Sequence, residues 1–492
     1  MYSAYVVKIE HLRPHPNADR LQVATIFGED TCVGLDVKFG DLGLYFPVDG
    51  QLSEEFCDEN HLCRKKADGT PDTGYLERES RKVKAIKLRG LKSNGLYCPL
   101  TSVEYTGVNL SDLTPGLVIT ALNGHEICCK YIPKRNPHAP RSGNSKNKSK
   151  IKKEDIAPLF KEHKDTEQLA YNLSAFKEGD QIEITLKMHG TSQRTGYLPV
   201  FKEYKHKYRL MQNLANTDIN KVGKAVRDLV LRARSTATPV YDWDYVTGTR
   251  RTVLAGEDGG FYGSNAFRTP HAKAFEGKLW KGETVYYEVV GFTNSGAPIM
   301  PSASNKKLED KNFITAYGPE TVFSYGCCPE GEKLMYGFDD NGPYALPVKV
   351  PQSDFYVYRM TMTNEDGYVV EYTPDFMRYR CEQMGVKTVP LLWCGSIPDD
   401  LGRFFDFNTG EEYEMTPGDW IKEKAETYYD GPDPIGKTHV REGVVIRIVN
   451  RPSFTAYKHK NWSFKVLSGI AIENAETSGA LNNASDDILS EM

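Results

Sequence analysis

Residues 182–192, with the sequence IEITLKMHGTS, hold the pattern on which the fold and chemistry of this chain depend. The run 182–186 is rich in β-branched residues and predicts a strand that ends at Lys187. A lysine amine becomes a nucleophile toward phosphorus when desolvation or nearby cations lower its pKa. His189 and Gly190 follow, and a glycine lets the backbone approach a phosphate closely. A lone Lys-x-x-Gly tetrapeptide is a weak signal, because ordinary turns often contain one. The prediction therefore depends on partners further along the chain.

Four further segments predict strands that carry charged or aromatic residues: residues 286–291 (YYEVVG), 355–359 (FYVYR), 441–447 (REGVVIR) and 457–461 (YKHKN). Glu288 and Glu442 each stand beside valines. Lys458 and Lys460 are two residues apart, so on a strand both side chains point to one face.

Each segment also has an ordinary explanation. A glutamate beside valines is most often a solvent-facing residue of an edge strand, and Lys-His-Lys is most often a solvated surface stretch. Five matches in a fixed order, each on a predicted strand, favour the functional interpretation. Their order and spacing resemble those of the covalent nucleotidyltransferases, and together they form the parts of an ATP-dependent polynucleotide ligase core.

The length and composition of the chain limit the number of domains and the kinds of protein that it can form. A chain of 492 residues, 39% of them hydrophobic, can bury more than one core, which corresponds to about two to four domains. We expect no membrane span, because no run of eighteen apolar residues occurs, and the first residues lack the layout of a signal peptide. The ten cysteines form no Cys-x-x-Cys pair, and Cys57, His61 and Cys63 lack a fourth metal ligand. We expect reduced thiols and a cytoplasmic, reducing location.

The distribution of charge is more informative than the net charge of −4. Residues 130–153 contain nine Lys or Arg and no acid, in a stretch rich in Ser, Asn and Pro. This stretch is either a solvated linker or a flexible arm that follows phosphates, and we favour a linker at 129–155 that also contacts phosphates. Residues 471–492 are acidic and are predicted to form a disordered tail.

The predicted fold class is α+β. Residues 1–128 contain short strand-like runs, at 4–9, 21–26 and 42–48, separated by turn signals. They predict an OB-type β-barrel, a fold often used to bind nucleic acid. Residues 156–470 are expected to form the nucleotidyltransferase domain, with ATP-grasp-like antiparallel sheets and helices.

One helix is predicted between the lysine and the strand of Glu288. In residues 219–235 the apolar positions Ile219, Val222, Val226, Leu229 and Val230 follow helical spacing. The other face is basic, and it is either solvated or in contact with the backbone of a duplex.

With both halves in view, the chain resembles the RNA ligases that carry an N-terminal OB domain and a C-terminal adenylyltransferase domain. The resemblance covers nearly the whole chain, and His189 stands where DNA ligases and capping enzymes usually have aspartate. Two departures are visible. Arg359 follows the aromatic position where some related ligases have aspartate, and residues 201–240 are longer than expected.

The resemblance implies a role for each motif residue. Lys187 would form the lysyl-AMP, and the remaining residues would bind the nucleotide: His189, Gly190, Arg250, Glu288, Tyr358, Glu442, Lys458 and Lys460. Tyr358 would stack on adenine, and Lys458 and Lys460 would contact the phosphates. Arg251 is an alternative to Arg250. The implied cofactors are ATP and Mg²⁺ or Mn²⁺, with Glu288 and Glu442 facing the metal and its water shell.

The expected activity is ATP-dependent sealing of 3′-OH and 5′-phosphate ends, at nicks in duplexes, with RNA or an RNA-containing duplex as partner and a monomeric protein. The alternatives are a capping-type guanylyltransferase, a general polynucleotide ligase, or an RNA-binding protein with a relict ligase core. DNA ligases and capping enzymes normally place the OB domain after the Lys-x-Lys strand. Only about thirty residues follow Lys460, too few for such a barrel, which favours the RNA ligase.

Overall fold

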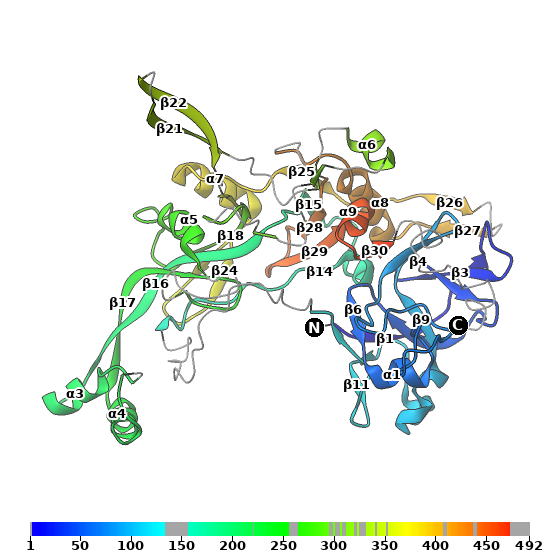
Figure 1. Ribbon diagram of the computed structural model, residues 1–492, viewed down its shortest axis with the longest axis horizontal. Helices are drawn as coiled ribbons and strands as arrows, with labels where there is room; N and C mark the ends of the chain where they lie inside the picture. Colours follow the sequence, from blue (N-terminus) through cyan, green and yellow to red (C-terminus); the bar gives the residue numbers. More distant parts are fainter. Residues whose placement is uncertain are drawn as a thin grey trace.

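The structure is a computed structural model. It describes residues 2–132, 156–219, 221–254, 264–294, 299–300, 306–307, 311–318, 322–323, 331–339, 342–350, 353–406, 411–435 and 440–472. The predicted linker at 129–155 and tail at 471–492 lie mostly outside these residues. In Figure 1 the barrel built from the N-terminal residues lies at the lower right, and the rest of the chain extends above it and to the left.

The N-terminal barrel consists of short strands that curve around one apolar core. Its main sheet has the order β10-β1-β5-β9, and β2-β3-β4 forms a second sheet. Successive residues of β5 point to opposite faces, and Leu44, Tyr45 and Phe46 are all buried, so both faces of this strand are covered. The predicted runs at 4–9, 21–26 and 42–48 correspond to three of the strands. The bounds are β1 (Ala4–Lys8), β2 (Leu12–Pro14), β3 (Leu21–Ile26), β4 (Glu29–Gly34), β5 (Leu42–Phe46), β6 (Gly50–Leu52), β7 (Ala85–Leu88), β8 (Leu91–Ser93), β9 (Leu96–Pro99), β10 (Val118–Ile119), β11 (Ala121–Leu122), β12 (His125–Glu126) and β13 (Cys128–Lys130).

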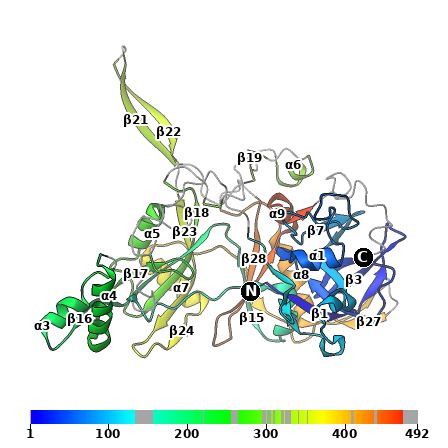
Figure 2. The same ribbon diagram turned by 60° about the horizontal axis from the view of Figure 1, so that its bottom comes forward.

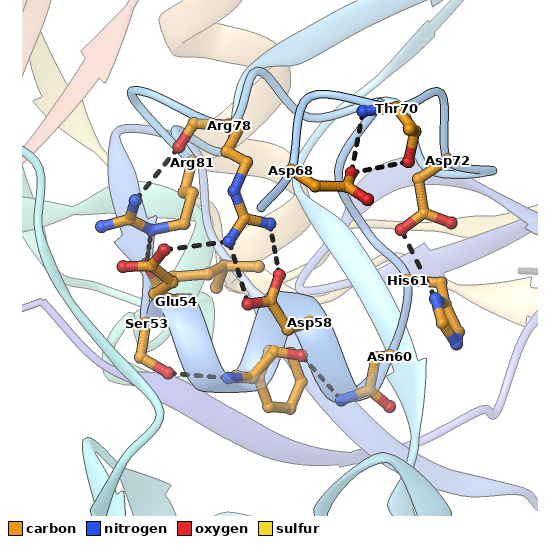
Figure 3. A network of polar contacts seen from close by, with 12 residues as sticks. Ser53, Glu54, Asp58, Asn60, His61, Asp68, Thr70, Asp72, Arg78 and Arg81 are labelled. Atoms are coloured by element: carbon orange, nitrogen blue, oxygen red, sulfur yellow. Dashed lines mark hydrogen bonds and ion pairs between the residues drawn. The ribbon is translucent and has the colours of Figure 1, made fainter. Parts of the chain in front are cut away.

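A short helix and a long loop close one side of the barrel. The helix α1 (Glu54–Glu59) begins at Ser53, whose side chain accepts a hydrogen bond from the backbone N–H of Phe56. In the following loop, Arg78 donates to Asp58 and, over 2.9 Å, to Glu54 (Figure 3). This arginine therefore attaches the loop to the solvent side of α1.

Two antiparallel sheets form the second domain. The first has the order β14-β29-β28-β15-β25, in which only β14 pairs in parallel, and the second has the order β17-β16-β18-β23-β24. The helices α8 and α7 pack against the first and second sheets. The bounds are β14 (Glu167–Gln168), β15 (Gln181–Leu186), β16 (Thr191–Lys205), β17 (Thr238–Gly248), β18 (Glu283–Gly291), β23 (Ser353–Thr363), β24 (Val369–Glu371), β25 (Leu391–Ser396), β28 (Gly443–Ile448), β29 (Thr455–Lys460), α7 (Pro374–Met384) and α8 (Pro417–Tyr429).

Smaller elements surround these sheets. The hairpin β21–β22 extends away from the domain in both views (Figures 1 and 2). The bounds are α5 (Thr269–Lys273), β19 (Lys306–Lys307), α6 (Lys311–Tyr317), β20 (Val322–Phe323), β21 (Gly331–Asp339), β22 (Gly342–Val350), β26 (Arg403–Asp406), β27 (Glu411–Glu414), α9 (Trp462–Leu467) and β30 (Ala471–Ile472).

The strands β16 and β17 form a long hairpin that carries two helices at its tip, α3 (Arg209–Ala215) and α4 (Lys224–Thr236). In both views these helices lie at the end of the molecule remote from the barrel (Figures 1 and 2). The helix predicted at 219–235 is thus present, but it begins at Lys224, after Gly223. Its apolar positions are not all buried: Val230 is, whereas Val226 and Leu229 are exposed. The reason is that α4 packs mainly on the small helix α3.

The barrel is attached to the second domain through the end of the described chain. The strand β30 pairs in parallel with β7 of the barrel, so residues 471–472, assigned to the tail by the sequence, belong to a sheet. Trp462 on α9 packs with Ala85 and Ala471, and the Lys92 ammonium lies 5.4 Å from the Trp462 ring. No helix within the described residues is long and apolar enough to cross a membrane.

Candidate active site

Lys187 follows β15 directly, and its backbone N–H donates to the carbonyl of Gly443 over 3.0 Å. This bond fixes the loop after β15 to the first residue of β28. Gly443 has a φ of +142°, and a Cβ there would lie 2.1 Å from the carbonyl oxygen of His459. Only glycine fits between these two strands. The position before it, Glu442, is therefore held next to Lys187.

The Glu442 carboxylate is the centre of the site. Its Oε1 lies 2.7 Å from the Lys187 Nζ and 3.4 Å from the Lys460 Nζ, and its Oε2 lies 2.9 Å from the His189 Nδ1. Burial alone would raise the pKa of this carboxyl, but Lys187, Lys460 and His189 outweigh burial and hold its pKa well below the usual value. Glu442 is thus a buried anion that pairs with the lysine predicted to be the nucleophile.

His189 links this centre to the core. Burial lowers the pKa of its imidazole, although Glu442 opposes that shift. A neutral ring that faces a carboxylate through Nδ1 donates its proton there. The ring also makes an edge contact with Phe464 of α9, with centroids 4.8 Å apart. His189 therefore fixes the orientation of the Glu442 carboxylate through its contact with Oε2.

Lys458 and Lys460 lie on β29, and their side chains approach Lys187 from the same face, as their spacing predicted. Burial, with the neighbouring charges of Lys187 and Lys460, lowers the pKa of Lys458 to about 8. The pKa of Lys460 is also lowered by burial, against the attraction of Glu442. Two lysines on the Glu442 carboxylate, with Lys458 near both of them, leave an excess of positive charge, which suits a polyanionic ligand.

Gly190 brings the two sheets together. A Cβ at this position would lie 2.3 Å from the carbonyl oxygen of Val289 on β18. The sequence suggested a close approach to phosphate, whereas the close neighbour in the structure is the backbone of the second sheet. The absence of a side chain lets the Lys187 loop cross directly into β16.

Glu288 belongs to the central strand β18 of the second sheet, opposite Ser192 on β16. Burial raises the pKa of its carboxyl to about 7, Glu442 adds to the shift, and Lys187 opposes it. Glu288 and Glu442 are the two carboxyls predicted to face a metal. Among the described residues, no group of three or more His, Cys, Asp or Glu side chains is arranged to hold an ion.

Tyr358 lies on β23 at an irregularity in its pairing with β18. Its hydroxyl is 2.9 Å from the Ser192 hydroxyl, and its ring packs with Leu186 and Met188 beside the lysine. The edge of His163 contacts the same ring, with centroids 5.1 Å apart. The Tyr358 ring thus stands at the wall of the pocket, where the sequence predicted a stacking aromatic.

Arg359, the departure from the ligase pattern, has a structural role. Its guanidinium forms an ion pair with Glu371 at 2.8 Å, with both side chains buried. It also lies 3.2 Å from the Nδ1 of His163. Burial first, and then Arg359 and other arginines, lower the pKa of His163 to about 3, so its neutral Nδ1 accepts this hydrogen bond.

Arg250 and Arg251 follow β17 and share one partner. Arg250 forms an ion pair with Asp165, and Arg251 lies 3.3 Å from the other oxygen of that carboxylate. Arg250 lines the pocket beside Lys187, whereas the Arg251 side chain is 70% exposed. This arrangement supports Arg250 as the motif arginine.

Four of the predicted site residues, Lys187, Arg250, Glu288 and Tyr358, line a pocket between the two sheets, with an empty volume of about 920 Å³ counting its open mouth. The rings of Tyr358 and Phe454 line this pocket together with Lys187 and Arg250. Its lining comes from both sheets, from α7 and from several connecting segments: His163, Thr166, Glu183, Thr185, Leu186, Lys187, Met188, Arg250, Glu288, Tyr358, Met377, Arg378, Val389, Val445, Arg447, Phe454 and Ala456.

Several of these residues were not predicted. Glu183 and Arg378 form an ion pair of 2.5 Å in the pocket wall. Outside the lining, buried Arg268 donates to Thr191 over 2.8 Å and to the Ser192 carbonyl over 3.2 Å, which holds the start of β16. Glu183 had a signal, since it lies on the strand before Lys187. Arg378 and Arg268 gave no signal in the sequence, because they lie far from their partners along the chain.

The chain thus consists of an OB-type barrel followed by a domain of two antiparallel sheets, with Lys187 at the end of a strand. A family profile described as an OB-fold domain matches residues 3–100, and no curated protein matches the chain.

The fold is similar to solved structures of an RNA ligase from Naegleria gruberi. The structure with PPi is 14% identical, with a TM-score of 0.51, and the match covers 94% of this chain and 97% of that one. A variant with ATP and Mn is also 14% identical, with a TM-score of 0.51 and 95% and 98% coverage. The predicted fold class is confirmed over both domains.

Proposed function

We propose that this chain is an ATP-dependent RNA ligase that acts through a lysyl-AMP intermediate. One observation carries the proposal: Lys187 lies at the end of a strand and lines a pocket, 2.7 Å from the buried Glu442 carboxylate, with Lys460 on the same carboxylate and Lys458 nearby. The solved proteins with the same fold are RNA ligases, with PPi in one case and with ATP and Mn in another.

In this proposal the adenosine occupies the pocket between Tyr358 and Val445, which lie on opposite sheets. An aromatic ring on one side and an aliphatic side chain on the other suit a flat base. The triphosphate then lies toward Arg250, Lys458 and Lys460. Glu288, at the ribose side of Lys187, is left to contact the sugar or the water shell of a metal.

The first step forms a bond between the Lys187 Nζ and the α-phosphorus. The bond from that phosphorus to the bridging oxygen breaks, and pyrophosphate leaves with the electron pair. Lys187 must first lose a proton, and Glu442 is its nearest base. Lys458 and Lys460 stabilise the charge that develops on the phosphates. A bound Mg²⁺ or Mn²⁺ would add charge neutralisation, with ligands from Glu288, Glu442, phosphate and water.

In the next two steps AMP passes from Lys187 to a 5′-phosphate, and a 3′-OH then displaces AMP to form the phosphodiester. We propose RNA at the 3′-OH end, in a nicked duplex. The eight cysteines within the described ranges are free thiols, which fits the reducing interior of a cell.

Incubation of the protein with ATP labelled at the α-phosphate tests the first step. We expect a covalent AMP adduct on the native protein and none on Lys187→Ala, while the matched exposed-lysine variant Lys273→Ala is labelled normally. Circular dichroism and thermal unfolding show whether both variants are folded. Labelling of folded Lys187→Ala with the same mass shift would remove Lys187 from the mechanism.

A sealing assay tests the substrate. Nicked duplexes with ribose or deoxyribose at the 3′-OH end are compared, with ATP and then GTP as nucleotide. We expect sealing with ATP and ribose. Equal sealing of the all-deoxy nick would indicate a general polynucleotide ligase, labelling with GTP alone a capping-type enzyme, and no labelling at all a binding protein with a relict core.

A further inference from the structure

The helical tip of the β16–β17 hairpin is the most basic part of the described chain that the proposed function does not use. Residues 202–236 contain nine Lys or Arg and three Asp or Glu, an excess of six positive charges in a chain whose net charge is −4. We call residues 202–236 the basic arm.

Three of these cations contact other groups of the arm or of its hairpin. Arg234 donates from Nε to the Ala215 carbonyl over 2.9 Å and lies over the Tyr204 ring, so it holds α4 against α3 and β16. Lys202 pairs with Asp244 on β17, and Lys221 lies 3.8 Å from Asp218. These three cations stabilise the arm itself.

The remaining exposed cations are not neutralised by a carboxylate, although the Lys207 ammonium lies 5.8 Å from the centroid of the Tyr208 ring. Lys205, Lys207, Arg209, Lys224 and Arg232 are exposed, and none of them makes an ion pair with another described residue. Exposed cations that no carboxylate neutralises are the groups that bind phosphates, because they release condensed counterions from the nucleic acid.

The turn before α3 adds a second feature. Tyr208 is 63% exposed and stands between Lys207 and Arg209. Its backbone N–H donates to the Nδ1 of His206 over 3.0 Å, which fixes the turn. Tyrosine hydroxyls, like lysine and arginine, commonly contact phosphate oxygens. The exposed Leu210 and Leu229 would also suit a protein partner, but the charge excess favours a polyanion.

The position of the arm relative to the site follows from strand geometry. β16 begins beside the catalytic pocket, where Ser192 pairs with Glu288, and ends at Lys205 in the arm. A strand rises about 3.3 Å per residue, so this distance is roughly 40 Å. One helical turn of B-form DNA is about 34–36 Å, and A-form RNA has a turn of similar but somewhat shorter length. The arm therefore lies about one turn away from the reacting ends.

We propose that the basic arm binds the phosphate backbone of a nucleic-acid duplex about one helical turn from the end-joining site. The distance to the reacting ends rests on the proposed ligase function, whereas the binding of nucleic acid by the arm does not. The flanking duplex is thus held at two separate places, the pocket and the arm.

The test uses full-length protein with the triple substitution Lys205→Gln, Lys207→Gln and Arg209→Gln. The matched control is Lys8→Gln, Lys177→Gln and Lys273→Gln, since these lysines are also exposed but lie outside the arm. Affinity for nicked RNA duplexes is measured over a range of salt concentrations. One duplex extends about half a turn and the other about two turns on each side of the nick.

We expect the arm variant to bind the long duplex at least about tenfold more weakly, with a salt dependence shallower by roughly two to three units of log–log slope. Its affinity for the short duplex and its lysyl-AMP labelling should equal those of the control. Unchanged affinity and slope on the long duplex would overturn the proposal, and so would equal losses on both duplexes. Absent labelling in every protein, with the arm effect retained, would instead overturn only the ligase function.

Discussion

Glu442 determines the electrostatics of the site at the scale of single residues. It is the one carboxylate within contact distance of Lys187, Lys460 and His189 at once, among the residues that the structure describes. It keeps the lysines close together despite their mutual repulsion. A bound triphosphate would take over part of this role, because its charge would neutralise Lys458 and Lys460.

Lys458→Ala tests the role of the cations in the first step. We expect a fall of about a hundredfold or more in the rate of lysyl-AMP formation, since a cation that stabilises the developing charge is lost. Lys458→Arg should retain part of the rate, because the charge stays while its geometry changes. Quenched-flow measurement with labelled ATP gives both rates. A normal rate in Lys458→Ala would show that this lysine does not contact the phosphates.

Glu288→Gln tests the raised carboxyl pKa. The folded pKa of about 7 lies above the usual 4.5, so the stability of the folded state falls as pH rises from about 4.5 through 7. The Glu288→Gln variant does not lose stability over this pH range, because the glutamine side chain does not ionise. We expect it to be more stable than the native protein at pH 8, by at most roughly 3 kcal/mol, and equal to it near pH 4.

Urea unfolding in the presence of a chelator measures both stabilities, and Glu10→Gln, at an exposed position, is the control. Equal stability of native and Glu288→Gln proteins at pH 8 would contradict the raised pKa.

The sequence was informative for residues whose role depends on a local pattern. Lys187 was recognised at the end of a predicted strand, Glu442 as a carboxylate on a predicted strand, and Lys460 from its spacing of two from Lys458, and the structure brings the three together. Their roles stay predictions. The pair Glu183–Arg378 and the contacts of Arg268 could not be found, because long-range contacts leave no periodic signal in one sequence.

Among the elements, the junction of β28 and β29 tolerates the least change. In Gly443→Ala the new Cβ would meet the His459 carbonyl at 2.1 Å. In the control Gly385→Ala, at the end of α7, φ is +67° but no atom lies within 4 Å. We expect about 1 kcal/mol of destabilisation in the control and clearly more in Gly443→Ala, measured by chemical unfolding. An equal loss of unfolding free energy in the two variants would show that β28 and β29 can move apart without a free-energy cost.

Strands were predicted more accurately than the helix of the arm. The strands that carry Glu288, Tyr358 and Lys458 are central or paired on both sides, so burial imposes a strong pattern. The helix predicted at 219–235 starts later, because Gly223 precedes its first turn. Its leucines are partly exposed, and for that reason apolar spacing alone misjudged which face is buried.

For the whole molecule, the important contact is that between barrel and second domain. Trp462 is buried against Ala85 and Ala471, and the Tyr171 ring lies 5.4 Å from that of Tyr5 in the barrel. We expect a single calorimetric transition for the native protein. Trp462→Ala should cost about 3–5 kcal/mol and separate the transition into two. A control, Trp280→Ala, removes a tryptophan that is 49% exposed and should leave one transition.

The parallel pairing of β30 with β7 also limits how such a protein can evolve by exchange of domains. A barrel that is joined to its neighbour only by a linker can be replaced by recombination at one point of the gene. Here the last described strand, β30, pairs with β7 of the first domain. A barrel taken from another protein would therefore lack the strand edge that pairs with Ala471 and Ile472. The sequence that encodes the barrel and the sequence that encodes β30 must therefore be inherited together for either domain to keep its surface covered.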